Sequence, residues 1–345
     1  MQFTIEKDYR YIAARFVSQK ILKEVLSRNI QGCIASIFNH SFNIETDERF
    51  LINIGAENLP MTPRSILLSI EDFHEEIFPE IYSGLPFSTL KGSLYFPGIG
   101  LFISVQKAAQ FNPKKNLLKE ILPKERVERN LSAGAEFIRR ARKRIRGIDY
   151  SPLSDYFLCR NGFISSTQGK PEEITFTASK RRDLFYGSDP KLWKRIDSFL
   201  YAIRKHSWDE VTVALKLILG FGPGLTPSGD DFLSGFIAAG IAVNQVRESI
   251  SDSIRRIIDK VREEADGKTT KVSISMIEDA CNGDFAEPVW KFIRITLLSE
   301  EMSEIESACQ RLWKIGGSSG EDLFNGLATG ILFFICNGHN IKNSQ

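Results

Sequence analysis

The sequence predicts an α+β protein, with an N-terminal mostly antiparallel β domain followed by an all-helical C-terminal domain. Before residue 115, apolar residues gather in short runs bounded by turn-forming residues, which is typical of β-strands. After residue 189 they recur every three or four positions, which is typical of amphipathic helices. We therefore expect a β-rich domain at residues 1–115, a helix and an irregular junction at residues 116–189, and a helical domain at residues 190–345.

The β domain is predicted from short apolar runs at residues 33–38, 50–54, 66–70, 93–96 and 101–105. The last two runs flank Pro97-Gly-Ile-Gly100, a connection of hairpin length that is rich in turn-forming residues. Hairpins of this kind join antiparallel strands. Residues 12–26 are the stretch of this half with a helical pattern, and residues 175–177 in the junction are a candidate strand.

Composition and charge indicate an ordinary folded protein. Hydrophobic residues make up 42% of the chain, charged residues 26%, and the formal net charge is +2. This charge gives no support to a nucleic-acid or membrane-surface partner. No apolar run approaches the roughly 18 residues needed to cross a bilayer, and Glu6, Lys7 and Asp8 stand where a secretory leader would be apolar. We expect a cytoplasmic protein that binds neither nucleic acid nor membrane.

The cysteines and histidines predict neither disulfides nor a zinc site. The five cysteines form no Cys-x-x-Cys pair, and the four histidines show no metal-ligand spacing. We therefore expect reduced thiols and no bound cofactor.

A helix with a strongly basic face is predicted at residues 125–148, where apolar positions recur at three- and four-residue intervals. The opposite face carries Arg139, Arg140, Arg142, Lys143, Arg144 and Arg146. This face either contacts an anion or a nucleic acid, or is a solvated surface whose charges favour the C-terminal end of the helix.

Capping signals mark the helices that follow. Asp189 is expected to be an N-cap, with Pro190 at the first helical position. Ser207 and Glu210 form a capping-box pattern that opens the next helix, and Gly220 ends that helix.

A glycine- and proline-rich loop then separates two helices, with the sequence Gly220-Phe-Gly-Pro-Gly-Leu-Thr-Pro-Ser-Gly229. Proline fixes φ and glycine reaches positive φ, so the loop is structured and lets a ligand or another backbone approach closely. Ser228 is expected to cap the following helix, whose N-terminal N–H groups would suit a phosphate or a carboxylate. The candidate substrate-binding residues here are Gly222, Gly224, Thr226, Ser228, Gly229 and Asp230.

Asp231 is a candidate catalytic residue whose role has three interpretations. It caps its helix, or it holds a metal ion such as Mg²⁺ that recruits the anion, or it accepts protons from an amide or ammonium group of the substrate. The loop is not a P-loop, because no Lys-Ser or Lys-Thr follows the glycines, and the helix before it excludes the dinucleotide fingerprint. A tight connection between two well-capped helices is the alternative to a functional site.

A second copy of this helix start occurs near the end of the chain. Residues 228–239 align without gaps on residues 319–330, and both segments begin Ser-Gly-acid-Asp. Asp322 is therefore equivalent to Asp231 and is the second candidate catalytic residue, with the metal, if one is bound, between the two. The candidate binding residues of this copy are Ser318, Ser319 and Gly320.

A glycine follows each aspartate by one helical turn, Gly235 in the first copy and Gly326 in the second. Close helix contact at these glycines would bring Asp231 and Asp322 together in one pocket. Chance similarity between two capped helices is the alternative.

The hydroxyls of Thr270 and Ser273 form a third polar cluster, on the first turn of a helix that begins at Thr269-Thr-Lys-Val-Ser273. They either cap this helix or form one wall of a pocket that orients a small polar ligand. We include both among the candidate substrate-binding residues.

These motifs resemble a known family. Gly222-Pro-Gly-Leu-Thr-Pro-Ser-Gly-Asp-Asp-Phe-Leu-Ser-Gly235 is similar to the hallmark of the family named for AllH, a subunit of oxamate carbamoyltransferase, which was formerly a domain of unknown function. The segment Gly317-Ser-Ser-Gly-Glu-Asp-Leu323, together with Thr269, Thr270 and Ser273, resembles its later blocks. Residues 36–60 resemble its N-terminal β region.

The resemblance implies a role in the last steps of anaerobic purine or allantoin degradation, where oxamate and carbamoyl phosphate are interconverted with oxalurate and phosphate. It implies a transferase subunit that needs other subunits, and homo-oligomers are compatible with it. The small anionic substrate would bind at the helix N-termini, with Asp231 or Asp322 accepting hydrogen bonds from its amide. The arginine motif with which ordinary carbamoyltransferases bind carbamoyl phosphate is missing, so either a partner subunit supplies those cations or this subunit is not where phosphate binds. The alternative is a non-catalytic binding or scaffold protein for a small carboxylate or phosphate.

Overall fold

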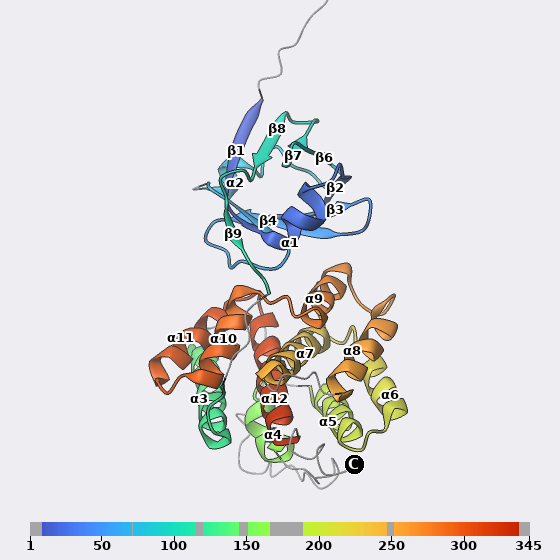
Figure 1. Ribbon diagram of the computed structural model, residues 1–345, viewed down its shortest axis with the longest axis vertical. Helices are drawn as coiled ribbons and strands as arrows, with labels where there is room; N and C mark the ends of the chain where they lie inside the picture. The colour runs from blue at the N-terminus through green and yellow to red at the C-terminus, as the bar shows by residue number, and fades with distance from the viewer. Residues whose placement is uncertain are drawn as a thin grey trace, which may run out of the picture. The chain divides into compact units, whose positions relative to one another are not determined.

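The computed structural model describes residues 9–70, 72–114, 120–144, 151–165, 189–246 and 252–337. The chain divides into two compact units. The first consists of Met1–Lys115 with Asp284–Glu287, and the second of Asn116–Gly283 with Pro288–Gln345. Figure 1 shows that strands build the first unit and helices the second. Arg146 and the candidate strand at residues 175–177 lie outside the described residues.

The first unit is a closed barrel of eight strands with a ninth strand beside it (Figure 1). The order around the sheet is β5-β4-β3-β2-β6-β7-β8-β1-β9, and a further pairing between β5 and β1 closes the barrel. The strands are β1 (Arg10–Ser18), β2 (Gln31–Phe38), β3 (Ser41–Thr46), β4 (Leu51–Ala56), β5 (Ser65–Leu68), β6 (Pro86–Leu90), β7 (Ser93–Phe96), β8 (Leu101–Ser104) and β9 (Ala109–Phe111).

The predicted mostly antiparallel β domain is wrong, although the α+β class fits. The barrel is mixed, because β1 pairs in parallel with both β8 and β9, and β4 pairs in parallel with β5. The parallel partners of β1 lie far along the chain, and residues 57–64 join β4 to β5 without a hairpin, so the turn signals that reveal hairpins give no sign of these pairings. Closure of the barrel likewise depends on β1 and β5, which lie far apart in the sequence.

The helix predicted at residues 12–26 is also wrong over its first half. Strand β1 extends to Ser18, and only the remainder is helical, in the short α1 (Gln19–Ile21) and the π-helix η1 (Leu22–Leu26). Ile12 and Ala14 are buried while Tyr11 and Ala13 are exposed, which is the two-residue alternation of a strand. A further short helix, α2 (Phe73–Glu76), follows β5.

Apolar side chains fill the interior of the barrel, among them Phe42, Phe96 and Ile54, which are fully buried. The segment Asp284–Glu287 belongs to this unit although it comes from the helical half of the sequence. The carboxylate of Asp284 accepts a hydrogen bond from the ammonium of Lys20 at 2.7 Å, in a buried ion pair. The barrel is therefore tied to a chain segment that is remote in sequence.

The second unit is built around two buried helices, α7 (Ser228–Val246) and α12 (Ser319–Asn337), which pack against each other more extensively than any other pair of elements. Nearly every residue along both helices is buried, and a helix that is apolar on all sides belongs at the centre of a domain. The surrounding helices are α3 (Lys124–Arg144), α4 (Tyr156–Ser165), α5 (Pro190–Arg204), α6 (Trp208–Ile218), α8 (Asp252–Ala265), α9 (Lys271–Cys281), α10 (Glu287–Leu298) and α11 (Met302–Trp313).

Of the caps predicted at Asp189, Ser207 and Thr270, two are confirmed and one is wrong. The side chain of Asp189 accepts the N–H of Lys191 at 2.7 Å, and Thr270 accepts the N–H of Ser273 at 3.1 Å. Ser207 makes no side-chain cap, because its backbone, at φ −84° and ψ 83°, leaves the extended region that N-cap residues use.

Candidate functional site

The two Ser-Gly-acid-Asp segments occupy equivalent structural positions. Each begins a helix of 19 residues, α7 or α12, that follows a loop from a shorter helix, α6 or α11. A side chain on Gly229 would collide with the carbonyl of Ile218 at the end of α6, and one on Gly320 would collide with that of Leu312 near the end of α11. The same glycine therefore permits the same close contact in both copies, which is evidence for an internal repeat.

The predicted close crossing at the two downstream glycines is confirmed. A side chain on Gly235 would meet the main chain of Leu323 and Leu327 in α12, and one on Gly326 would meet the main chain of Phe232 in α7. Main chain thus packs directly on main chain at the crossing. Because Asp231 and Asp322 lie one turn before these glycines, the crossing brings the two helix starts together.

The carboxylates of Asp231 and Asp322 are buried, with 1% and 0% of each residue exposed. One oxygen of Asp322 accepts a hydrogen bond from the hydroxyl of Ser151. Among the described residues, neither oxygen of Asp231 has a hydrogen-bond partner, nor has the second oxygen of Asp322. Unpartnered buried carboxylate oxygens are costly, so these three atoms are an unusual feature of the buried helix starts.

Burial raises the pKa of both carboxyls. The pKa of Asp231 is raised well above its ordinary value by desolvation, and next by the charge of Asp322. Burial raises the pKa of Asp322 to about 7, while hydroxyls led by Ser151 and Ser228 favour its charged form. Ser319 in turn lowers the pKa of Asp231. Each aspartate is thus influenced by the first serine of the other helix.

Capping is excluded as the role of these two aspartates. The N–H groups of Asp230 and Asp231 donate to the carbonyl of Pro227 at 2.9 and 3.1 Å, so Ser228 is not the cap either. In the second copy the N–H groups of Glu321 and Asp322 donate to the carbonyl of Ser318 at 3.0 and 3.1 Å. The N–H groups of Asp230, Asp231, Glu321 and Asp322 are therefore already used and are not free to hold an anion.

Asp230 links three segments of the chain by hydrogen bonds. Its carboxylate accepts the N–H of Gly220, at 2.8 Å, and the hydroxyl of Thr269. These contacts join the start of α7 to the start of the Gly/Pro loop and to the connection before α9. Asp230 is therefore engaged in holding the loop, and only its neighbour Asp231 keeps both oxygens without a partner.

Hydroxyls link the loop to the second copy and to α9. The hydroxyls of Thr226 and Ser319 are joined by a hydrogen bond at 2.8 Å. Both hydroxyls also lower the pKa of Asp231, which means that they favour its charged form. Thr270 donates to the carbonyl of Leu225 while it caps α9, and Ser273 reaches the same carbonyl at 3.5 Å. The cap at Thr270 is thus confirmed, while its role as one wall of a pocket for a small polar ligand stays a prediction.

The glycines of the loop act in different ways. Gly222 has φ +121°, and a side chain there would press against Ser228. Gly224 has φ +90°, with open space where its side chain would be. The missing side chain of Gly222 therefore lets the loop pack closely against the start of α7. Gly224 is needed only for the positive φ of the turn.

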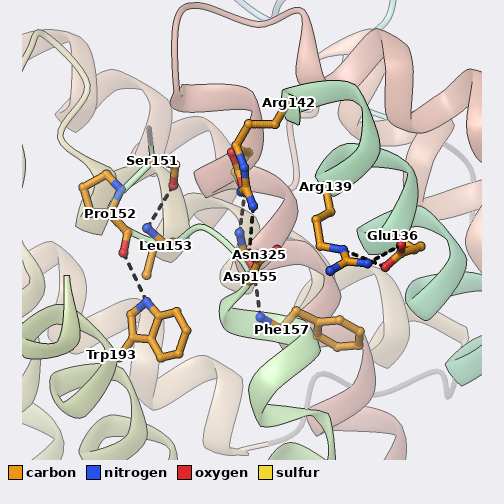
Figure 2. A network of polar contacts seen from close by, with 11 residues as sticks. Glu136, Arg139, Arg142, Ser151, Pro152, Leu153, Asp155, Phe157, Trp193 and Asn325 are labelled. Atoms are coloured by element: carbon orange, nitrogen blue, oxygen red, sulfur yellow. Dashed lines mark hydrogen bonds and ion pairs between the residues drawn. The ribbon is translucent and has the colours of Figure 1, made fainter. Parts of the chain in front are cut away.

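A buried ionic group beside α12 was not recognised from the sequence. Arg142 of α3 binds Asp155 at 2.8 Å and also binds Glu321, and all three side chains are buried. Figure 2 shows Arg142 pointing at Asp155, just before Phe157, whose N–H donates to Asn325 of α12 at 3.0 Å. Burial raises the pKa of Glu321 to about 7, and Arg142 opposes this shift.

The basic face of α3 is largely engaged within the chain. Arg139 pairs with Glu136 at 2.7 Å, and Arg140 pairs with Glu306 at 2.9 Å. Neither interpretation of this face predicted that Arg142 is buried in ion pairs. Its partners Asp155 and Glu321 come from segments whose packing no local pattern reveals. The aligned repeat could have given one signal that Glu321 is engaged inside the protein, because Glu321 aligns with Asp230 at the start of the other central helix.

A separate groove of about 720 Å³ lies along α10 and α11. Lys291, Arg294 and Arg311 supply basic groups to it, and Glu300 and Glu304 supply acidic ones. None of the candidate residues lines this groove, so it is distinct from the aspartate pair.

Within the described ranges, no three histidine, cysteine or acidic side chains converge in a way that could hold a metal ion. Nor does any helix in the described part of the chain have the length and apolar character needed to span a membrane.

The fold and the site define a protein with a mixed β-barrel unit and a helical unit whose two central helices are internally repeated. Residues 218–331 match the family described as "Oxamate carbamoyltransferase subunit AllH", and residues 11–110 match the "AllH family N-terminal domain". The chain belongs to the AllH family. A search of curated proteins and a search of solved structures each found no match.

Proposed function

We propose that this chain is a subunit of a carbamoyltransferase assembly that interconverts oxamate and carbamoyl phosphate with oxalurate and phosphate, in anaerobic purine or allantoin degradation in the cytoplasm. Support comes from the family, which is named for a subunit of oxamate carbamoyltransferase and matches both halves of the chain. The matched residues 218–331 contain the Gly/Pro loop, both aspartates and the crossing of α7 with α12.

The proposed site for the small anionic substrate lies at the paired starts of α7 and α12. The observation that carries it is the buried pair of aspartates with three unpartnered oxygens. Because the N–H groups of both aspartates and of the acidic residues before them are used, the substrate carboxylate would be bound by hydroxyls such as those of Thr226 and Ser319, which are half-buried. The amide of oxamate would donate to an ionised aspartate.

The proposed role of the aspartates in the reaction is to accept a proton. The amide nitrogen of oxamate attacks the carbamoyl carbon, a C–N bond forms, the bond from that carbon to the phosphate oxygen breaks, and phosphate leaves with the bonding electrons. The nitrogen must lose one proton, which an ionised Asp231 or Asp322 would accept. Arg142 is already paired with Asp155 and Glu321, so we expect another subunit to supply the cations that bind the phosphate.

A non-catalytic binding or scaffold subunit is the second candidate function. The observation that favours it is the near-complete burial of both aspartates, which keeps them away from a substrate in the free chain. Under this alternative the loop would sense a small carboxylate or phosphate, and another chain would carry out the chemistry.

Reconstitution tests the proposal. The chain alone and the chain with its partner subunits are supplied with carbamoyl phosphate and oxamate, and oxalurate is measured. We expect nearly no product from the chain alone and turnover by the complete assembly. Full activity of the isolated chain would refute the need for partners. An assembly that forms but uses neither oxamate nor any other ureido-acid precursor would refute the reaction class.

A further inference from the structure

Three oxygens of the aspartate pair have no hydrogen-bond donor among the described residues. Both carboxylates are buried, and the charge of Asp322 acts on Asp231 directly. Two ionised carboxylates that are buried together repel each other strongly, and one proton removes that repulsion while it also supplies a donor.

We propose that Asp231 and Asp322 share a single proton at neutral pH, so that the pair carries one negative charge and offers one hydrogen-bond donor beside one acceptor. The hydroxyl of the protonated carboxyl satisfies an oxygen that otherwise has no partner. A proton needs no cavity, whereas a metal ion needs further ligands, and no third acidic, histidine or cysteine side chain converges on the pair among the described residues.

The other charged groups around the pair are already engaged. On α7, Asp230 accepts from Gly220 and Thr269, and on α12, Glu321 binds Arg142 of α3. The groups on the remaining packed elements are Asp155, which binds Arg142; Arg160 of α4, which binds Asp197 of α5; and the hydroxyls of Ser151, Ser273 and Ser228. Neither Arg142 nor Arg160 is thus left to neutralise the second aspartate, and a proton does so.

The arrangement is matched to one class of ligand, and this step rests on the proposed function. A primary amide presents a carbonyl acceptor next to an N–H donor, which is the complement of a half-protonated carboxyl pair. Oxamate and the carbamoyl group both carry such an amide. In addition, one negative charge repels an anionic substrate less than two would.

The isolated chain, without substrate, provides the test. The infrared carbonyl band of protonated carboxylic acids is compared at pH 7 among the wild type, Asp231→Asn and Asp322→Asn. Each substitution should remove part of the band, because an amide replaces the shared acid. The melting temperature at pH 8 should stay the same or rise, since Asn supplies a neutral donor beside the remaining carboxylate.

Asp230→Asn is the matched control, because Asp230 is buried beside the pair but both of its oxygens have donors. It should lower the melting temperature and leave the shared-acid band in place. If both single variants keep the full band, the proposal fails. It also fails if Mg²⁺, Na⁺ or K⁺ stabilises the wild type but not Asp231→Asn, because a cation would then be the occupant. If the band behaves as expected but the assembly transfers no carbamoyl group, only the proposed function fails.

Discussion

Asp231 and Asp322 stand at the same position of a repeated helix start, and each lies under the influence of the first serine of the other helix. Ser319 favours the charged form of Asp231, and Ser228 favours that of Asp322. The crossing of α7 and α12 at glycine brings these two helix starts together. A repeated motif has thereby produced one buried acidic pair at the centre of the helical unit.

Stability should depend on pH through Asp322, whose pKa rises from an ordinary 3.8 to about 7 on folding. Below about pH 4 the carboxyl is protonated in both states. Between about pH 4 and 7 the folded state binds more protons, so the free energy of unfolding falls as the pH rises, by up to about 1.4 kcal/mol per pH unit for such a group. Urea unfolding at a series of pH values should show a shallower decline for Asp322→Asn. An unchanged slope in that variant would contradict the assignment.

Gly326→Ala should destabilise the protein by about 1–3 kcal/mol or more, because its side chain would collide with the main chain of Phe232. Gly317→Ala is the matched control in the loop just before α12. It has open space at that position and no left-handed backbone, so its effect should stay within about 0.5 kcal/mol. Equal effects in chemical unfolding would show that the crossing is not as tight as described.

Arg142→Met should cost about 3–5 kcal/mol, because it leaves Asp155 and Glu321 buried without their cation. The loss should be smaller at pH 5 than at pH 8, since Glu321, with a pKa of about 7, is neutral at the lower pH. Arg140→Met removes an exposed pair with Glu306 and should change stability by less than about 1 kcal/mol. A loss for Arg142→Met that does not vary with pH would argue against the ionic cause.

Thr270→Val should destabilise the start of α9 by about 1 kcal/mol, because it removes the cap on Ser273 and the hydrogen bond to Leu225. Thr270→Ser keeps the hydroxyl and should be nearly neutral. Limited proteolysis should cut Thr270→Val faster within the Gly/Pro loop. If Val and Ser behave alike, the hydroxyl has no such role.

Local patterns in the sequence predicted the parts of this protein that depend on neighbouring residues. The caps at Asp189 and Thr270, the repeated helix start and the close crossing at Gly235 and Gly326 follow from spacing and residue type. The mixed barrel does not, because β1 finds its parallel partners far along the chain. The same applies to Arg142, whose partners come from two distant segments, so its burial could not be distinguished from exposure on a basic helix face.

The most direct test of the account is carbamoyl transfer by the assembly reconstituted with Asp231→Asn. Asn keeps the size of the side chain but cannot accept or release the proton. We predict that the variant assembles normally and that kcat falls about 100-fold or more, the usual contribution of an acid–base group, while the KM for oxamate changes little. Wild-type kcat in a correctly assembled Asp231→Asn complex would contradict the claim that the aspartate pair is the functional centre of this chain.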